Sequence, residues 1–91
     1  MDRTRAHVHV SGTVQGVSFR ATTRDEARER GVDGWVRNLE DGRVEAVFEG
    51  TERDVEAMVE FCQGGSEAAR VEDVTVSYEE PEGEQRFRVR W

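Results

Sequence analysis

A glycine-bearing segment near the N-terminus carries residues that could bind an anion. Residues 10–20 read VSGTVQGVSFR, in which a strand-like run passes through Gly12 and Gly16 to Arg20, just before a helix-forming segment. Consecutive backbone N–H groups and a helix N-terminus can point at one spot and so hold an anion. The guanidinium of Arg20 would add a permanent charge whose fork geometry suits phosphate. The segment therefore predicts a phosphate-binding loop.

A second polar side chain, Asn38, ends the segment GWVRN at residues 34–38. Its uncharged carboxamide could hold a water molecule. Asparagine is depleted in β-strands, so its place in a strand-like segment favours a functional role. Alternation puts Asn38 on the face of Val36 and opposite Trp35, and the sequence leaves open which face meets the loop. A bound phosphate and an oriented water together indicate hydrolysis of a phosphoryl compound.

The chain has 91 residues, enough for one small domain, which we expect to span residues 1–91. No apolar run is long enough to span a bilayer, and no apolar segment follows the charged N-terminus, which argues against membrane insertion and export. The single cysteine, Cys62, cannot form an internal disulfide, which fits a reducing compartment. We expect a cytoplasmic monomer.

The composition is strongly acidic, with a net charge of −7, and all 13 basic residues are arginine. Nucleic-acid backbones attract basic surfaces, so nucleic acid is not an expected partner. Adaptation to high salt would explain this charge. At ~1 M salt the Debye length falls to about 3 Å, so repulsion between the acidic side chains is largely screened. Within this acidic surface we expect Arg24, one turn beyond Arg20, and Arg37, beside Asn38, to form a local positive region for an anionic substrate.

Hydropathy patterning predicts an α+β chain. Residues 41–42, Asp-Gly between two alternating segments, are a strong hairpin signal. Apolar residues from Val55 to Cys62 recur at helical spacing after a cap at Thr51. The expected elements are strands at 6–14, 34–40, 43–49, 71–78 and 87–91, a helix at 21–30 that ends at Gly31, and a helix from Thr51 to Gly64-Gly65.

The order of these elements is βαββαβ, with the last β contribution split by a turn near Pro81. This order predicts a ferredoxin-like sandwich, an antiparallel sheet with two helices on one face. Because that fold carries many functions, it does not by itself select one.

Two segments resemble the signatures of the acylphosphatase family. GxVQGVxFR at residues 12–20 resembles the first, and GWVRN at residues 34–38, followed by Gly42-x-Val44 and Gly50, resembles the second. The resemblance implies a metal-free and cofactor-free hydrolase that splits the carboxyl-phosphate bond of acyl phosphates, releasing a carboxylate and inorganic phosphate.

The resemblance also implies roles for individual residues. Arg20 takes the phosphate-binding role and Asn38 the water-orienting role. A cradle of N–H groups around the phosphate would be formed by the backbone amides of Gln15, Gly16, Val17, Ser18 and Phe19. Phosphoryl transfer through a loose transition state needs mainly positioning and charge stabilisation. Neither motif contains His, Asp or Glu, so we expect the substrate's own phosphate oxygen to receive the proton of the water.

Other reactive side chains have simpler interpretations. His7 and His9 share a strand face, but no third ligand stands at a recognisable spacing, so solvated strand residues are favoured over a metal site. Cys62 falls on an apolar helix stripe and is expected to be a buried structural thiol.

Two functional alternatives remain open. The first is a non-enzymatic module that binds phosphate or a metabolite without turnover. The second is an RNA-binding domain of the same topology, which would need exposed aromatic residues in basic surroundings.

Screening of the acidic surface should make this domain more stable in molar potassium chloride than in dilute buffer. Thermal unfolding across a potassium chloride series measures the effect. Equal stability at low and molar salt would contradict the high-salt interpretation.

Overall fold

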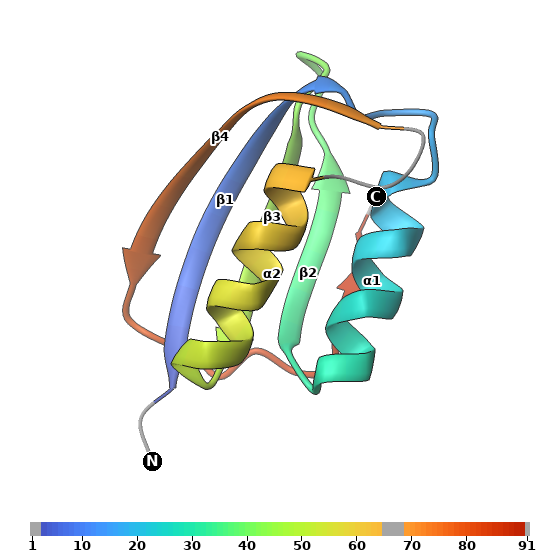
Figure 1. Ribbon diagram of the computed structural model, residues 1–91. Helices are drawn as coiled ribbons and strands as arrows, with labels where there is room; N and C mark the ends of the chain where they lie inside the picture. The colour runs from blue at the N-terminus through green and yellow to red at the C-terminus, as the bar shows by residue number, and fades with distance from the viewer. Residues whose placement is uncertain (1–2, 65–68, 91) are drawn as a thin grey trace.

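The computed structural model describes residues 3–64 and 69–90. Two helices cover one face of a five-stranded sheet (Figure 1). In chain order the elements are β1 (Thr4–Thr13), α1 (Phe19–Arg30), β2 (Asp33–Asn38), β3 (Val44–Gly50), α2 (Glu52–Gly64), β4 (Arg70–Glu79) and β5 (Arg88–Val89). The expected ferredoxin-like α+β arrangement is confirmed.

The strands lie in the order β4-β1-β3-β2-β5. The pairs β1–β4, β1–β3 and β2–β3 are antiparallel, whereas β5 pairs in parallel with β2 through Trp35–Arg88 and Val36–Val89. The sheet is therefore mixed and not wholly antiparallel, because residue alternation indicates a strand without giving its direction. Of the strand expected at 87–91, only two residues pair in β5, and residue 91 lies outside the described residues.

Helix α1 begins at Phe19, two residues before the expected start. The Phe19 side chain is buried in the core, and its carbonyl accepts a hydrogen bond from the Thr23 hydroxyl at 2.7 Å. Core packing therefore extends the helix into the motif and places Arg20 in the first turn. The helix ends at Gly31 as expected, in a left-handed conformation with φ of 72°.

The apolar core lies between the sheet and the helices. On β1, Ala6, Val8 and Val10 belong to this core, while His7 and His9 lie on the other face. The expected helical stripe of α2 is confirmed, with buried Val55, Met58, Val59 and Cys62. In the described parts of the chain, neither helix has the length and hydropathy required to cross a membrane.

A buried carboxylate, Glu49 of β3, anchors the segment between β4 and β5. It accepts hydrogen bonds from the Arg5 guanidinium at 2.7 Å and from the backbone N–H groups of Glu82, Gly83 and Glu84 at 2.8, 3.1 and 3.0 Å. Burial raises the pKa of Glu49, but the N–H of Glu82 and the Arg5 charge outweigh it and lower the pKa to about 2. Glu49 therefore stays ionised inside the fold.

Acid should destabilise the fold through this group. The folded pKa of Glu49 is about 2, below the ordinary value of 4.5, so its contribution is complete above pH 4.5 and is lost as the pH falls toward 2. Glu49→Gln should lower the free energy of unfolding at pH 7 by about 1.5–3 kcal/mol, the value of a charged hydrogen bond, and should flatten its pH dependence below pH 4.5.

Urea denaturation at pH 7, 4 and 3 measures both effects. The matched control is Glu56→Gln, an exposed carboxylate on α2. If the two variants lose equal stability with unchanged pH dependence, the anchoring role of Glu49 is wrong.

Candidate active site

The ends of β1 and β2 meet the start of α1 at one edge of the sheet. Because β1 and β2 each run antiparallel to β3, they are parallel to each other. Their C-terminal ends therefore lie at the same edge, where Figure 1 shows the loop before α1 beside the β2–β3 hairpin. This loop, residues 14–18, and Asn38 at the end of β2 thus occupy one edge of the molecule.

The structure settles which face of the sheet Asn38 shares. Val36 is fully buried in the core beneath the helices, and Asn38 follows two residues later on the same strand. Asn38 pairs with Val44, another core residue. Its Oδ1 is buried and accepts no hydrogen bond from the described residues. Asn38 therefore lies on the helix side, with an acceptor available to a small molecule.

The loop before α1 has an unusual backbone. Gly16 has φ of 74° and Ser18 has φ of 63°, so two left-handed residues stand within three positions. Such conformations direct successive N–H groups into a concave, anion-binding arrangement. Glycine adopts this conformation freely, whereas for Ser18 it costs about 1–3 kcal/mol. The Ser18 side chain makes no capping hydrogen bond that would offset this strain.

A cavity of about 390 Å³ opens beside the N-terminus of α1. Its lining includes Gly16, Ser18 and Phe19 of the expected cradle, the expected phosphate-binding Arg20, Arg24 of α1 and Val89 of β5. The structure thus brings four of the expected site residues to one cavity. Gln15, Val17 and Asn38 are not among its lining residues.

Gln15 has a side-chain role that the sequence did not reveal. Its Nε2 donates to the carbonyl oxygens of Leu39 and Arg43 at 2.8 and 2.9 Å. These two residues flank the β2–β3 turn, directly after Asn38. Gln15 therefore fixes the loop to the hairpin that carries Asn38. The sequence predicted only a backbone role here, because the partners are carbonyl groups that no residue type identifies.

The two additional arginines separate. Arg24 lines the cavity, with its Nε 3.0 Å from Asp25. Arg37 lies on the opposite face of the sheet, where its Nε donates to Glu45 at 2.6 Å and its guanidinium lies 5.4 Å from the Trp35 ring centroid. The expected contribution of Arg37 to a positive region beside Asn38 is therefore wrong, since adjacent strand residues point to opposite faces.

Two other residues singled out in the sequence have structural roles. Gly12 lies opposite a β-bulge in β4, and a Cβ there would stand 2.1 Å from the Arg70 carbonyl oxygen. The absence of a side chain at Gly12 therefore allows β1 and β4 to pack closely. Cys62 is fully buried, and burial raises the pKa of its thiol to about 12. It is a structural thiol, as expected.

Comparison with known proteins tests the family resemblance. The family model described as acylphosphatase matches residues 6–89. The chain belongs to the acylphosphatase family. A protein named acylphosphatase from Haloarcula marismortui is 69% identical to it and aligns over 100% of both chains. The acylphosphatase of Haloquadratum walsbyi is 68% identical, over 97% of this chain and 95% of that protein.

Solved structures of acylphosphatases agree with this membership. The crystal structure of the Bacillus subtilis acylphosphatase matches with a TM-score of 0.93 and 38% identity, over 97% of this chain and 99% of that one. The Coxiella burnetii acylphosphatase gives a TM-score of 0.93 and 39% identity, over 98% and 94%. The family expected from the two motifs is therefore confirmed, together with its fold.

Gln15→Ala should loosen the connection between the loop and the hairpin. Loss of two neutral hydrogen bonds is expected to lower the free energy of unfolding by about 1–3 kcal/mol. Urea denaturation gives this value, and hydrogen exchange should show faster exchange at residues 39–43. Gln63→Ala, at an exposed position on α2, is the matched control. Identical denaturation of the two variants would contradict the role of the Gln15 side chain in holding the loop to the hairpin.

Proposed function

We propose that this chain hydrolyses acyl phosphates to a carboxylate and inorganic phosphate at the edge formed by the 14–18 loop, the first turn of α1 and the end of β2. Membership of the acylphosphatase family supports the reaction class. One observation carries the assignment to this edge. A cavity lined by Arg20 at a helix N-terminus shares its sheet edge and face with a buried, unpartnered amide oxygen on Asn38.

The electrostatics of α1 favour an anion in that cavity. A helix N-terminus carries a partial positive charge that normally attracts acidic side chains. The first turn of α1 has no acidic residue and instead contains Arg20, whose charge opposes the helix dipole. A phosphate dianion would offset both the dipole and the guanidinium. In this proposal Arg20 binds two phosphate oxygens, and the loop N–H groups bind the third.

Asn38 is suited to orient the attacking water. A buried carbonyl oxygen without a hydrogen-bond donor costs about 1–3 kcal/mol, and a water O–H donated to Oδ1 would remove that cost. The water would then present a lone pair toward a phosphorus atom held by Arg20, which is catalysis by positioning. Among the described residues, the cavity lining contains no His, Asp or Glu, so the phosphate group itself receives the proton in this mechanism.

The donor set also bears on cofactors. The proposed site offers guanidinium groups, backbone N–H groups and a carboxamide. The part of the cavity lining that the structure describes has no carboxylate, imidazole or thiolate, which are the usual ligands of divalent metals. We therefore propose that hydrolysis at this site requires neither a metal nor a cofactor.

The working environment follows from the charge. We propose a cytoplasmic monomer adapted to high salt, with a small acyl phosphate as substrate and no nucleic-acid partner. The net charge of −7 and the similarity to proteins of halophilic archaea support the adaptation to high salt. The cavity would contact mainly the phosphate end of a substrate, which favours a broad range of acyl groups.

Arg20→Ala and Asn38→Ala test the two catalytic roles. Phosphate release from benzoyl phosphate is measured with a chelator present. Arg20→Ala should lower kcat/KM by about 10²–10³-fold, and Arg20→Lys should restore only part of it, since lysine lacks the planar fork. Asn38→Ala should lower kcat by about 10²-fold while inorganic phosphate binding is retained.

Arg53→Ala, an exposed arginine on α2, is the control for loss of one positive charge. Circular dichroism confirms folding of every variant. Phosphate binding by the wild-type chain without turnover would favour a binding module over an enzyme. Full activity of Asn38→Ala would contradict the water-orienting role.

A further inference from the structure

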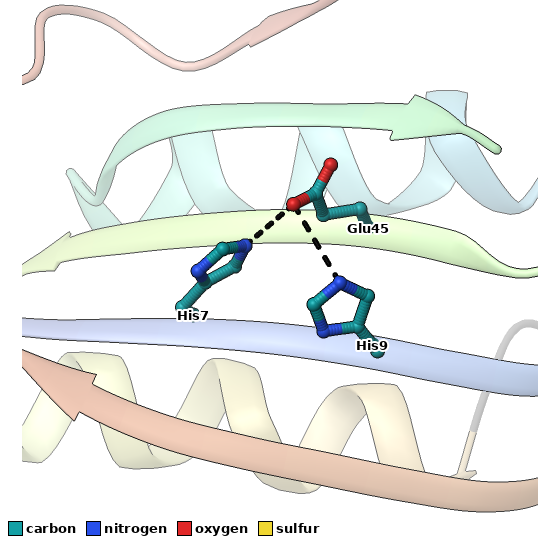
Figure 2. A group of neighbouring side chains, drawn as sticks. All are labelled: His7, His9 and Glu45. Carbon is teal, nitrogen blue, oxygen red and sulfur yellow. Dashed lines mark hydrogen bonds and ion pairs between the residues drawn. The ribbon is translucent and has the colours of Figure 1, made fainter.

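Three side chains converge on the sheet face that lies away from the helices. His7 and His9 project from β1, and Glu45 projects from β3 directly opposite His9 in the strand register. Figure 2 shows both imidazole rings directed at one carboxylate oxygen. The sequence expectation of no metal ligand here rested on the lack of a third residue at a recognisable spacing. The sheet supplies that residue from a position 38 residues after His7.

The distances within this cluster are close to those of a metal centre. The Oε2 atom of Glu45 lies 2.6 Å from His7 Nε2 and 3.6 Å from His9 Nε2, and one ligand atom from each residue falls within 4.8 Å of the others. In tetrahedral coordination with bonds of about 2.0–2.1 Å, ligand atoms stand about 3.3 Å apart. Small rotations of the two rings would bring all three atoms to that separation.

We propose that His7, His9 and Glu45 bind a divalent transition-metal ion of the zinc class. Two imidazoles and one carboxylate form a donor set that suits zinc, and solvent would complete the tetrahedron. The side chains of His7 and His9 are 25% and 29% exposed, and that of Glu45 is 9% exposed. The cluster is thus partly shielded, yet open to an ion and to a fourth ligand from solvent.

Neighbouring side chains already hold the ligands in a metal-binding orientation. Glu79 of β4 lies 3.0 Å from Nδ1 of His7, which places the proton on that nitrogen and leaves Nε2 as the metal ligand. Arg37 donates to Oε1 of Glu45 at 2.6 Å, so Oε2 is left facing the imidazoles. His7 and Glu45 thus each have a second hydrogen-bond partner, as the ligands of bound zinc usually do.

The same contacts could serve a charged His7 held between Glu45 and Glu79. The position of His9 favours a metal. Its ring lies 5.0 Å from the His7 ring and directs Nε2 at the same Glu45 oxygen. A charged His7 accounts for the contacts of one ring only, whereas one shared cation satisfies both rings and the carboxylate.

This site is independent of the proposed hydrolysis. It lies on the face of the sheet opposite α1 and its cavity, so a bound ion would touch no residue of that reaction. An ion held by β1 and β3 would instead join these strands and stabilise the native state.

Titration calorimetry of the chelator-stripped protein with zinc chloride tests the proposal. One equivalent should bind, and zinc should raise the Tm. His9→Gln should weaken binding by about 100-fold or more, and Glu79→Gln by about 10–100-fold through loss of ligand orientation. Cobalt(II) should give the intense visible absorption of a tetrahedral site, which His9→Gln should abolish.

Two control variants separate this site from other groups. Glu56→Gln removes an exposed carboxylate on α2, and Cys62→Ser removes the buried thiol; both should bind zinc as the wild type does. His7→Gln should weaken zinc binding as His9→Gln does, and if His7→Gln fails to fold, His9→Gln provides the test. The proposal is overturned by absence of saturable zinc binding, by wild-type affinity in His9→Gln, or by a cobalt–thiolate band that Cys62→Ser removes.

Discussion

Backbone pairing of β3 with β1 on one side and β2 on the other is the constraint on which the rest of the structure depends. It makes β1 and β2 parallel and so delivers the loop before α1 and Asn38 to one edge. It also sorts side chains between two faces. Every residue of β3 is buried, including Glu45 and Glu49, whose charges are met by partners from other strands. One central strand thus organises an apolar side and an ionic side.

The candidate active site combines features that are unfavourable when taken singly. A serine in left-handed conformation, an arginine in the first turn of a helix and an unpartnered buried amide oxygen all lie at one edge. Costs of this kind persist where the surrounding structure fixes the backbone. The Gln15 hydrogen bonds and the packing of Phe19 supply that fixation here. In the proposed function, a phosphate ligand would interact with Arg20 and the helix N-terminus, and a water molecule with the amide oxygen of Asn38.

Local patterns in the sequence were sufficient for the family, the order of elements and the ferredoxin-like fold. These patterns did not predict contacts in which one partner is distant in the sequence or is a backbone group. The direction of β5, the bracing contacts of the Gln15 side chain and the approach of Glu45 to the histidines depend on pairing between strands. The face of the sheet on which Arg37 lies could have been predicted, because strand alternation places it opposite Asn38.

The outermost strand β4 has a further consequence for how copies of this chain meet. No other described strand pairs with its outer side, and such an edge invites pairing with another molecule. Exposed Glu72 and Asp73 place negative charge along it, which repels an identical edge in dilute solution. Concentrated salt shortens the reach of that repulsion to about 3 Å. In concentrated salt, the bulge opposite Gly12 and the hydration of these carboxylates would be the features left to oppose such pairing.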